Sequence, residues 1–334
     1  MLMHGSWKPV LVLFFLSPII GELLSGSTPL LHFLNPFALF FLTGLYGSGA
    51  IIVREIIRRW GKGWASVLLL GAAYGVLEEG VMVKSFFDPS WPDLGLLGTY
   101  GRWLGVNWVW AEWLIIYHAI YSITIPIIFV ELVFPEYRHI KYLSNRSLIL
   151  FFALISFVVI FGHIFMTPYR LTFFELIGCF FTMAILIHLA KRVKHRRLGG
   201  SGGHVRSRWL WLLGTISGFT YFIIIFNYLP SIGVPVILTM LAGLGFTGLI
   251  AGLVLYASRN GLSGFNGLNL AAGFLTLLFF LSFILEAAKP GVKNYTGQAA
   301  VSIAFIILLI LLGRKVLRNS LRLDSLYVET CLFH

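Results

Sequence analysis

The sequence predicts an all-α fold: a polytopic membrane protein with about ten transmembrane helices. Of its 334 residues, 58% are hydrophobic and only 11% are charged, whereas charged residues make up about a quarter of a soluble domain. The mean hydropathy is +0.88. Apolar stretches close to the roughly 20 residues that a membrane helix needs recur along the whole chain. This composition excludes a soluble globular protein.

The expected spans follow from these apolar stretches. They cover residues 8–24, 36–57, 64–86, 108–134, 147–166, 171–190, 209–227, 234–257, 267–287 and 298–313. The first stretch has one lysine before it and no small-x-small cleavage site. It therefore indicates a retained helix rather than a signal peptide.

The basic residues predict the orientation of these spans. With the N-terminus in the cytoplasm, 20 of the 25 Lys and Arg residues fall on the cytoplasmic side. Such an excess is typical of cytoplasmic loops, so both termini are expected to be cytoplasmic. The net charge of +12 then indicates contact with anionic lipid headgroups and not with nucleic acid. We expect the plasma membrane of a prokaryote.

The longest polar break, residues 191–208, joins a basic cluster to a Gly/Ser stretch and is expected to be a flexible cytoplasmic linker. It divides the chain into a six-helix membrane bundle, residues 1–190, and a four-helix bundle with a basic tail, residues 209–334. In the second bundle, Gly248 and Gly252 form a G-x-x-x-G pair, which favours close helix packing. Cys179 and Cys331 indicate neither a disulfide framework nor a structural zinc site.

Two adjacent carboxyl groups, Glu78 and Glu79, lie within the third span. Even insertion-based scales assign a cost of about 2.5–3.5 kcal/mol to an Asp at a helix centre. Side chains of neighbouring residues on an α-helix point about 100° apart. We therefore expect one of the two to face a cavity and the other to hold a neighbouring helix. Gly71 and Gly75 share the face of Glu78 and would leave room beside it.

The other costly polar residues fall mainly in the first six spans and in the outer loop between the third and fourth. Each needs a partner in low dielectric, so we expect a single polar cavity. The expected catalytic residues are Glu78, Glu79, His118 and His163, and the expected substrate-binding residues are Lys84, Asp88, Arg102, Glu112, Thr167 and Glu175. Glu22 is a weaker candidate near the interface. Arg54 is expected to snorkel to the inner boundary.

Three strings, YGVLEEGVMVKSFF, LIIYH and FGHIFMT, together resemble the CAAX-protease and bacteriocin-processing superfamily of intramembrane glutamic proteases. The resemblance implies that Glu78 or Glu79 activates water. It further implies that His118 matches the second motif of that superfamily and His163 the third.

These residues favour a membrane-embedded, peptidase-like hydrolase. A carboxylate would be the general base, and the two histidines would orient the water or stabilise the oxyanion. No cofactor or metal is required, although Glu79, His118 and His163 are a possible metal set. The substrate would be a membrane peptide or a lipid-linked molecule. A proton- or cation-coupled transporter and a lipid-binding protein are the alternatives.

Overall fold

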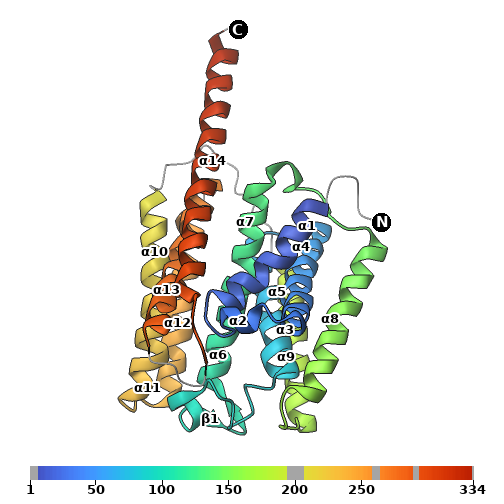
Figure 1. Ribbon diagram of the computed structural model, residues 1–334, viewed down its shortest axis with the longest axis vertical. Coiled ribbons are helices and arrows are strands. Elements are labelled where there is room, and N and C mark those ends of the chain that lie inside the picture. Colours follow the sequence, from blue (N-terminus) through green and yellow to red (C-terminus); the bar gives the residue numbers. More distant parts are fainter. Residues whose placement is uncertain (1–6, 194–206, 258–263, 289–292, 333–334) are drawn as a thin grey trace.

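The computed structural model describes residues 7–193, 207–257, 264–288 and 293–332, the last fourteen of these by backbone alone. The long helices lie side by side in one bundle, and α14 projects beyond it at one end (Figure 1). Most of the linker predicted at residues 191–208 falls outside the described residues.

The first part of the bundle comes from residues 7–192. Its elements are α1 (Trp7–Pro18), η1 (Ile19–Leu23), α2 (Leu30–Phe33), α3 (Pro36–Leu42), η2 (Thr43–Gly47), α4 (Ser48–Trp60), α5 (Trp64–Gly75), η3 (Val76–Met82), η4 (Gly95–Gly98), the antiparallel strands β1 (Arg102–Trp103) and β2 (Val106–Asn107), α6 (Trp108–Tyr117), η5 (His118–Thr124), α7 (Ile125–Val133), η6 (Pro135–Tyr137), α8 (Asn145–Phe165) and α9 (Phe173–Arg192).

The second part follows from residue 207. Its elements are α10 (Ser207–Phe219), η7 (Thr220–Tyr228), α11 (Leu229–Ser231), α12 (Val236–Ala257), α13 (Gly264–Ala287) and α14 (Gln298–Leu332). It packs on the first part where α13 meets α7 and where α12 meets α6.

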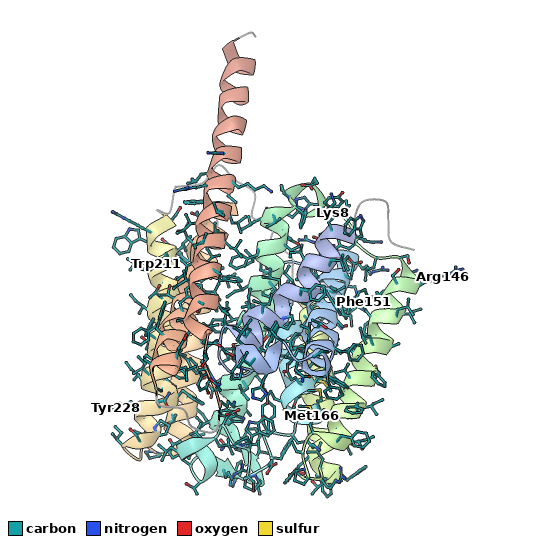
Figure 2. The ribbon with its side chains drawn as sticks, in the orientation of Figure 1. Lys8, Arg146, Phe151, Met166, Trp211 and Tyr228 are labelled. Carbon is teal, nitrogen blue, oxygen red and sulfur yellow. The ribbon has the colours of Figure 1, made fainter. Side chains whose placement is uncertain are left out.

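The prediction of an all-α polytopic membrane protein is confirmed. Across the described ranges, nine helices of 19–26 residues are long and apolar enough to cross a membrane. The first expected span corresponds to the continuous helix of α1 and η1, which is shorter than these nine. Lys8 and Arg146 lie toward the end from which α14 projects, here called the basic end (Figure 2). Met166 and Tyr228 lie toward the opposite end, the loop end, which carries β1 and β2 (Figures 1 and 2). Which end faces the cytoplasm stays a prediction.

Several long helices contain a π-helical segment. In the first part, η2 and η5 each lie within a long helix, whereas η1 and η3 form the C-terminal ends of the helices that α1 and α5 begin; η7 lies within a helix of the second part. π-Helices account for well under 1% of residues in globular proteins. They appear mostly as short bulges and frequently at functional sites. Four of them in neighbouring helices therefore point to that region of the bundle.

Close helix packing in the second part does not use the G-x-x-x-G pair, although Gly243 on the same helix does pack closely, since a Cβ there would meet the Tyr221 hydroxyl at 2.9 Å. A Cβ added to Gly248 or Gly252 would meet no described atom within 4 Å. One added to Gly214 would meet the Leu270 carbonyl oxygen at 2.6 Å, so α10 and α13 are in close backbone contact there. The prediction for the G-x-x-x-G pair is wrong within the described chain, because α12 lies at the periphery and buries little of its surface.

The basic end of α4 is fixed by a buried ion network. The Arg54 side chain is 1% exposed, so the prediction that it snorkels is wrong. Its guanidinium donates to the Ile140 carbonyl at 2.6 Å, pairs with Glu55 at 3.0 Å and lies 3.3 Å from the centroid of the Tyr142 ring. Glu55 in turn accepts a hydrogen bond from the Tyr142 N–H at 2.7 Å. These contacts attach the connection between η6 and α8 to α4.

Arg54→Met tests this network. The substitution leaves Glu55 without one of its buried partners and removes the donor to the Ile140 carbonyl. Removing one member of a buried pair typically costs about 3–5 kcal/mol. We expect a loss of that order in the free energy of unfolding of the detergent-solubilised protein. Arg146→Met is the control, because Arg146 is exposed. Equal stability of the two variants would contradict the role of Arg54.

Candidate functional site

A buried polar cluster lies where the four π-helical segments of the first part meet. Glu22 belongs to η1, Tyr46 to η2, Glu78 and Glu79 to η3, and His118 to η5. Glu78 and His118 are 4% and 2% exposed. The structure thus brings together three of the four expected catalytic residues, with Glu22 and Tyr46 as further members.

His118 lies between the two adjacent carboxyl groups. Its Nε2 is 3.1 Å from Oε1 of Glu79, and its Nδ1 is 3.3 Å from Oε2 of Glu78. The expectation that only one glutamate faces the site is therefore wrong. The reason is the π-helical turn, which has more residues than an α-helical turn, so that successive side chains diverge by roughly 80° instead of 100°. Both carboxyl groups then reach the same imidazole.

The cluster extends through hydrogen bonds in two directions. On one side, the Tyr46 hydroxyl donates to Oε1 of Glu22, and the Thr28 hydroxyl donates to Oε2 of Glu22 at 2.6 Å. On the other side, the Ser85 hydroxyl donates to Oε2 of Glu79 and accepts from the Trp110 indole N–H at 3.0 Å. Hydrogen bonds therefore extend from the cluster toward Thr28 on one side and toward Trp110 on the other.

Sequence reasoning missed Tyr46, Ser85 and Ser122 as members of this site. The Ser122 hydroxyl lies 2.9 Å from Nδ1 of His118, one helical turn away. The spacing of four residues on one helix was the signal for Ser122. For Tyr46 the signal was a tyrosine inside a membrane span, since a buried hydroxyl usually finds a hydrogen-bond partner.

The cluster has more acidic than basic groups. Within the described ranges, Glu22, Glu78 and Glu79 form no ion pair with a lysine or arginine, and His118 is the basic side chain in contact with them. Oε2 of Glu78 is buried and accepts no hydrogen bond from any described group. The site thus holds more potential negative charge than one imidazolium balances, and Oε2 of Glu78 has only the 3.3 Å contact with Nδ1 of His118, which is not a hydrogen bond.

The glycines on the Glu78 face fill a different role from the predicted one. A Cβ on Gly71 would lie 2.9 Å from Cα of Ala119, and one on Gly75 would lie 3.2 Å from Cβ of His118. The space that they leave is taken up by the backbone of η5 and by His118 and is not open. Close approach of the two helices is what brings His118 within reach of both carboxyl groups.

His163 does not join the cluster. It lies on α8, where its Nδ1 is 2.7 Å from the Val81 carbonyl oxygen. Lys84 is fully buried and donates to the carbonyl oxygens of His163 at 2.7 Å and Tyr169 at 3.0 Å. Lys84 therefore secures the C-terminal end of α8 and points away from the glutamates. Its backbone φ of +62° is unusual for a residue other than glycine.

Three further candidates form a network at the loop end. Arg102 donates to the carbonyl oxygens of Phe87 at 2.8 Å and Asp88 at 3.0 Å, and the Asp88 carboxylate accepts from the Ser90 N–H at 2.8 Å. Burial lowers the pKa of the Arg102 guanidinium, with Tyr169 and Asp88 opposing the shift. Glu175 completes a capping box with Thr172 at the start of α9.

Tyr169 links this network to α9. Its hydroxyl donates to Glu175 at 2.9 Å. Burial, followed by this hydrogen bond, raises the pKa of Tyr169 to about 12. The tyrosine therefore stays neutral and remains a donor at physiological pH. Each group in the network has a partner inside the chain, so a role in substrate binding stays a prediction.

The last two candidates lie elsewhere. Glu112 accepts a hydrogen bond at 2.9 Å from the Tyr221 hydroxyl of η7 and so joins the two parts of the bundle. Thr167 is buried, and its backbone carbonyl oxygen lies 3.4 Å from Nζ of Lys84.

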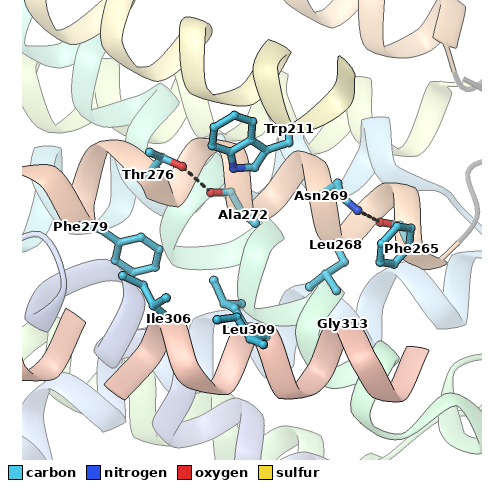
Figure 3. Close-up of a pocket in the computed structure, with 11 residues that line it drawn as sticks. Trp211, Phe265, Leu268, Asn269, Ala272, Thr276, Phe279, Ile306, Leu309 and Gly313 are labelled. Carbon is cyan, nitrogen blue, oxygen red and sulfur yellow. Dashed lines mark hydrogen bonds between the residues drawn. The ribbon is translucent and has the colours of Figure 1, made fainter. Parts of the chain in front are cut away.

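A cavity of about 340 Å³ lies outside the cluster, between α10, α13 and α14. Figure 3 shows its mainly apolar lining; Thr276 and Asn269 direct their polar groups to the carbonyl oxygens of Ala272 and Phe265 on their own helix. The polar cluster and this apolar cavity therefore belong to different parts of the fold.

Gly71→Ala tests the close approach of α5 and η5. The new methyl group would overlap the backbone at Ala119, and overpacking of this kind typically costs about 1–3 kcal/mol. We expect a loss of that order in the free energy of unfolding in detergent. Gly178→Ala is the matched control, because a Cβ there meets nothing within 4 Å. Since alanine is the better helix former, this control should be neutral or slightly stabilising. Equal effects of the two substitutions would contradict the packing described.

Comparison with known proteins corrects one expectation. A family model described as an uncharacterized membrane protein family matches residues 11–333. The assignment to the CAAX-protease and bacteriocin-processing superfamily is therefore wrong. The motifs of that superfamily are short, and His163, which the resemblance places at the site, lies outside the cluster. Neither the curated proteins nor the solved structures provide a match. The chain, an integral multi-pass membrane protein, belongs to an uncharacterized membrane protein family.

Proposed function

We propose that the protein is a membrane-embedded hydrolase that uses Glu78, Glu79 and His118 to activate a water molecule. The observation that carries the proposal is the position of His118, with one carboxyl group at each ring nitrogen. A histidine flanked in this way has a fixed orientation, and a carboxylate beside it can accept a proton. The four surrounding π-helical segments favour a functional role over simple packing.

The exposure of the three side chains distinguishes their roles. The Glu79 side chain is 12% exposed, against 6% for Glu78 and 3% for His118. Glu79 is therefore the most accessible of the three, and we assign it as the general base. His118 orients Glu79 and stabilises the negative charge that develops, while Glu78 holds the other side of the ring.

The reaction would be hydrolysis of an amide or ester bond in a membrane peptide or a lipid-linked substrate. Glu79 takes one proton from water, and the oxygen attacks the carbonyl carbon. The tetrahedral intermediate then collapses, the bond to the leaving amine or alcohol breaks, and the proton held by Glu79 passes to the leaving group. Water is consumed, and no oxidant or reductant is needed.

The surroundings of the cluster favour hydrolysis over transport. Between the cluster and the ion network at the basic end lie the fully buried side chains of Ile51, Ile123 and Ile127. This apolar layer separates the two polar centres. The hydrogen bonds from Glu79 through Ser85 to Trp110 lie on the side of the loop end, which favours a reaction site entered from that side.

A proton- or cation-coupled transporter is the second candidate. One observation favours it: the hydrogen-bonded path from Thr28 through Glu22 and Tyr46 to the cluster resembles a proton relay. Acidic groups within membrane helices are typical of such relays. In that case the isoleucine layer would have to open during transport.

Glu79→Gln, Glu78→Gln and His118→Ala test the hydrolase. Each variant is reconstituted in liposomes that contain a fluorogenic acyl-ester lipid or a fluorogenic transmembrane peptide. Because general acid–base catalysis contributes about 10²–10⁴-fold, we expect turnover to fall by at least the lower figure in each variant.

Glu286→Gln is the control for this assay. Glu286 is another glutamate at the end of a membrane helix, but it accepts hydrogen bonds from Gly297 and Ala299 in the second part of the bundle. We expect wild-type turnover from it. Full activity in the three cluster variants would sink the proposal. Proton flux into dye-loaded liposomes without hydrolysis of either probe would replace it with the transporter.

A further inference from the structure

We propose that Glu78, Glu79 and His118 bind one divalent transition-metal ion of the zinc class. Each residue offers a ligand atom, and these atoms lie within 4.8 Å of one another. The inference deepens the proposed function and rests on it for the role of the ion, which would hold and acidify the attacking water beside Glu79. The binding itself is independent of turnover.

The donor set matches this class of ion. Zinc in proteins takes carboxylate oxygen and imidazole nitrogen ligands at roughly 2.0–2.2 Å, and catalytic sites use three protein ligands with one position open. Two carboxylates and one imidazole supply three ligands. Calcium and magnesium prefer oxygen ligands throughout, so the histidine favours a transition metal.

The spacing of the donors is also suitable. Around an ion with bonds of roughly 2.0 Å, tetrahedral ligand atoms are about 3.3 Å apart. Nε2 of His118 and Oε1 of Glu79, at 3.1 Å, already have this spacing, and one ligand atom of Glu78 lies within 4.8 Å of the ligand atoms of the other two residues. One ring nitrogen would coordinate the ion and the other would keep a hydrogen bond. The Ser122 hydroxyl, already 2.9 Å from Nδ1, is placed for such a supporting contact.

The excess of acidic over basic groups in the cluster favours a bound cation. Glu22, Glu78 and Glu79 face a single imidazole, and no lysine or arginine in the described ranges pairs with them. Ionised carboxylates in a membrane interior are costly unless they are paired. A divalent ion would neutralise the two glutamates that contact His118.

Two neighbouring buried polar atoms, on Glu78 and Tyr74, point to a missing ligand. Oε2 of Glu78 and the hydroxyl of Tyr74 have no hydrogen-bond partner among the described residues. Both side chains belong to residues that are 4% exposed. The Tyr74 ring lies 6.0 Å from the His118 ring, centroid to centroid. Buried polar groups without partners are rare and indicate an unseen water or ion. An ion at the cluster gives the Glu78 oxygen a partner, and a water bound to the ion would serve Tyr74.

Zinc binding by the purified protein tests the site. Wild-type protein in detergent is stripped with a chelator and equilibrated with Zn²⁺. Bound zinc is then counted by mass spectrometry, and affinity is measured against a chromophoric chelator. We expect one zinc ion per chain. Glu78→Gln, Glu79→Gln and His118→Gln should each weaken binding by at least about 100-fold, and Ser122→Ala by about 10-fold.

Two further variants serve as controls for the zinc-binding test. His163→Gln removes a histidine that does not join the cluster and should bind zinc like the wild type. Glu79→Asp keeps a carboxylate and should retain binding if Glu79→Gln fails to fold. A wild type that binds no zinc, or binding that is equal in the wild type and in His118→Gln, would overturn the proposal.

The metal site and the hydrolase can fail separately. Stoichiometric zinc binding without hydrolysis of either fluorogenic probe would overturn the hydrolase and leave the metal site in place. Undiminished hydrolysis by chelator-treated protein that binds no zinc would overturn the metal site alone.

Discussion

The contact of one buried imidazole with two adjacent carboxyl groups is the interaction on which the centre of this structure depends. An isolated carboxylate in a membrane interior is costly, and two neighbouring ones repel each other as well. His118 lies between Glu78 and Glu79 and interacts with both. The surrounding hydroxyl groups of Tyr46, Ser85 and Ser122 then serve oxygens and a nitrogen that would otherwise lack partners.

The backbone is shaped to permit this contact. An α-helix would turn one of the two glutamates away, whereas the π-helical segment η3 directs both to the same side. Gly71 and Gly75 let α5 approach η5 closely enough for the His118 imidazole to reach both glutamates. At the basic end, the network of Arg54 and Glu55 attaches the connection between η6 and α8 to α4, the helix that continues from η2. The fully buried isoleucines between the two centres keep them apart.

Much of the fold was predictable from sequence, because membrane helices can be recognised by their length and hydropathy. The importance of Glu78, Glu79 and His118 was also predictable, because ionisable residues within apolar stretches are rare and easily recognised in a sequence. The pairing of both glutamates with one histidine was not, because it depends on a π-helical turn that leaves no clear mark in composition. The position of His163 outside the cluster was not predictable because its partner is a backbone carbonyl oxygen; Lys84 has partners of the same kind, and its role in substrate binding stays a prediction. Arg54 was misjudged because the loop after η6 covers it, and a hydropathy pattern does not reveal such a cover.

The most direct test is a double-mutant cycle between Glu79 and His118. The free energy of unfolding in detergent is measured for the wild type, Glu79→Gln, His118→Gln and the double variant. Residues in direct contact show interaction energies of about 0.5–3 kcal/mol, whereas distant residues are additive within about 0.5 kcal/mol. The contact described here predicts a coupling of at least about 1 kcal/mol, with the second substitution costing less once the first is made. Additive losses would contradict the placement of His118 between the two glutamates.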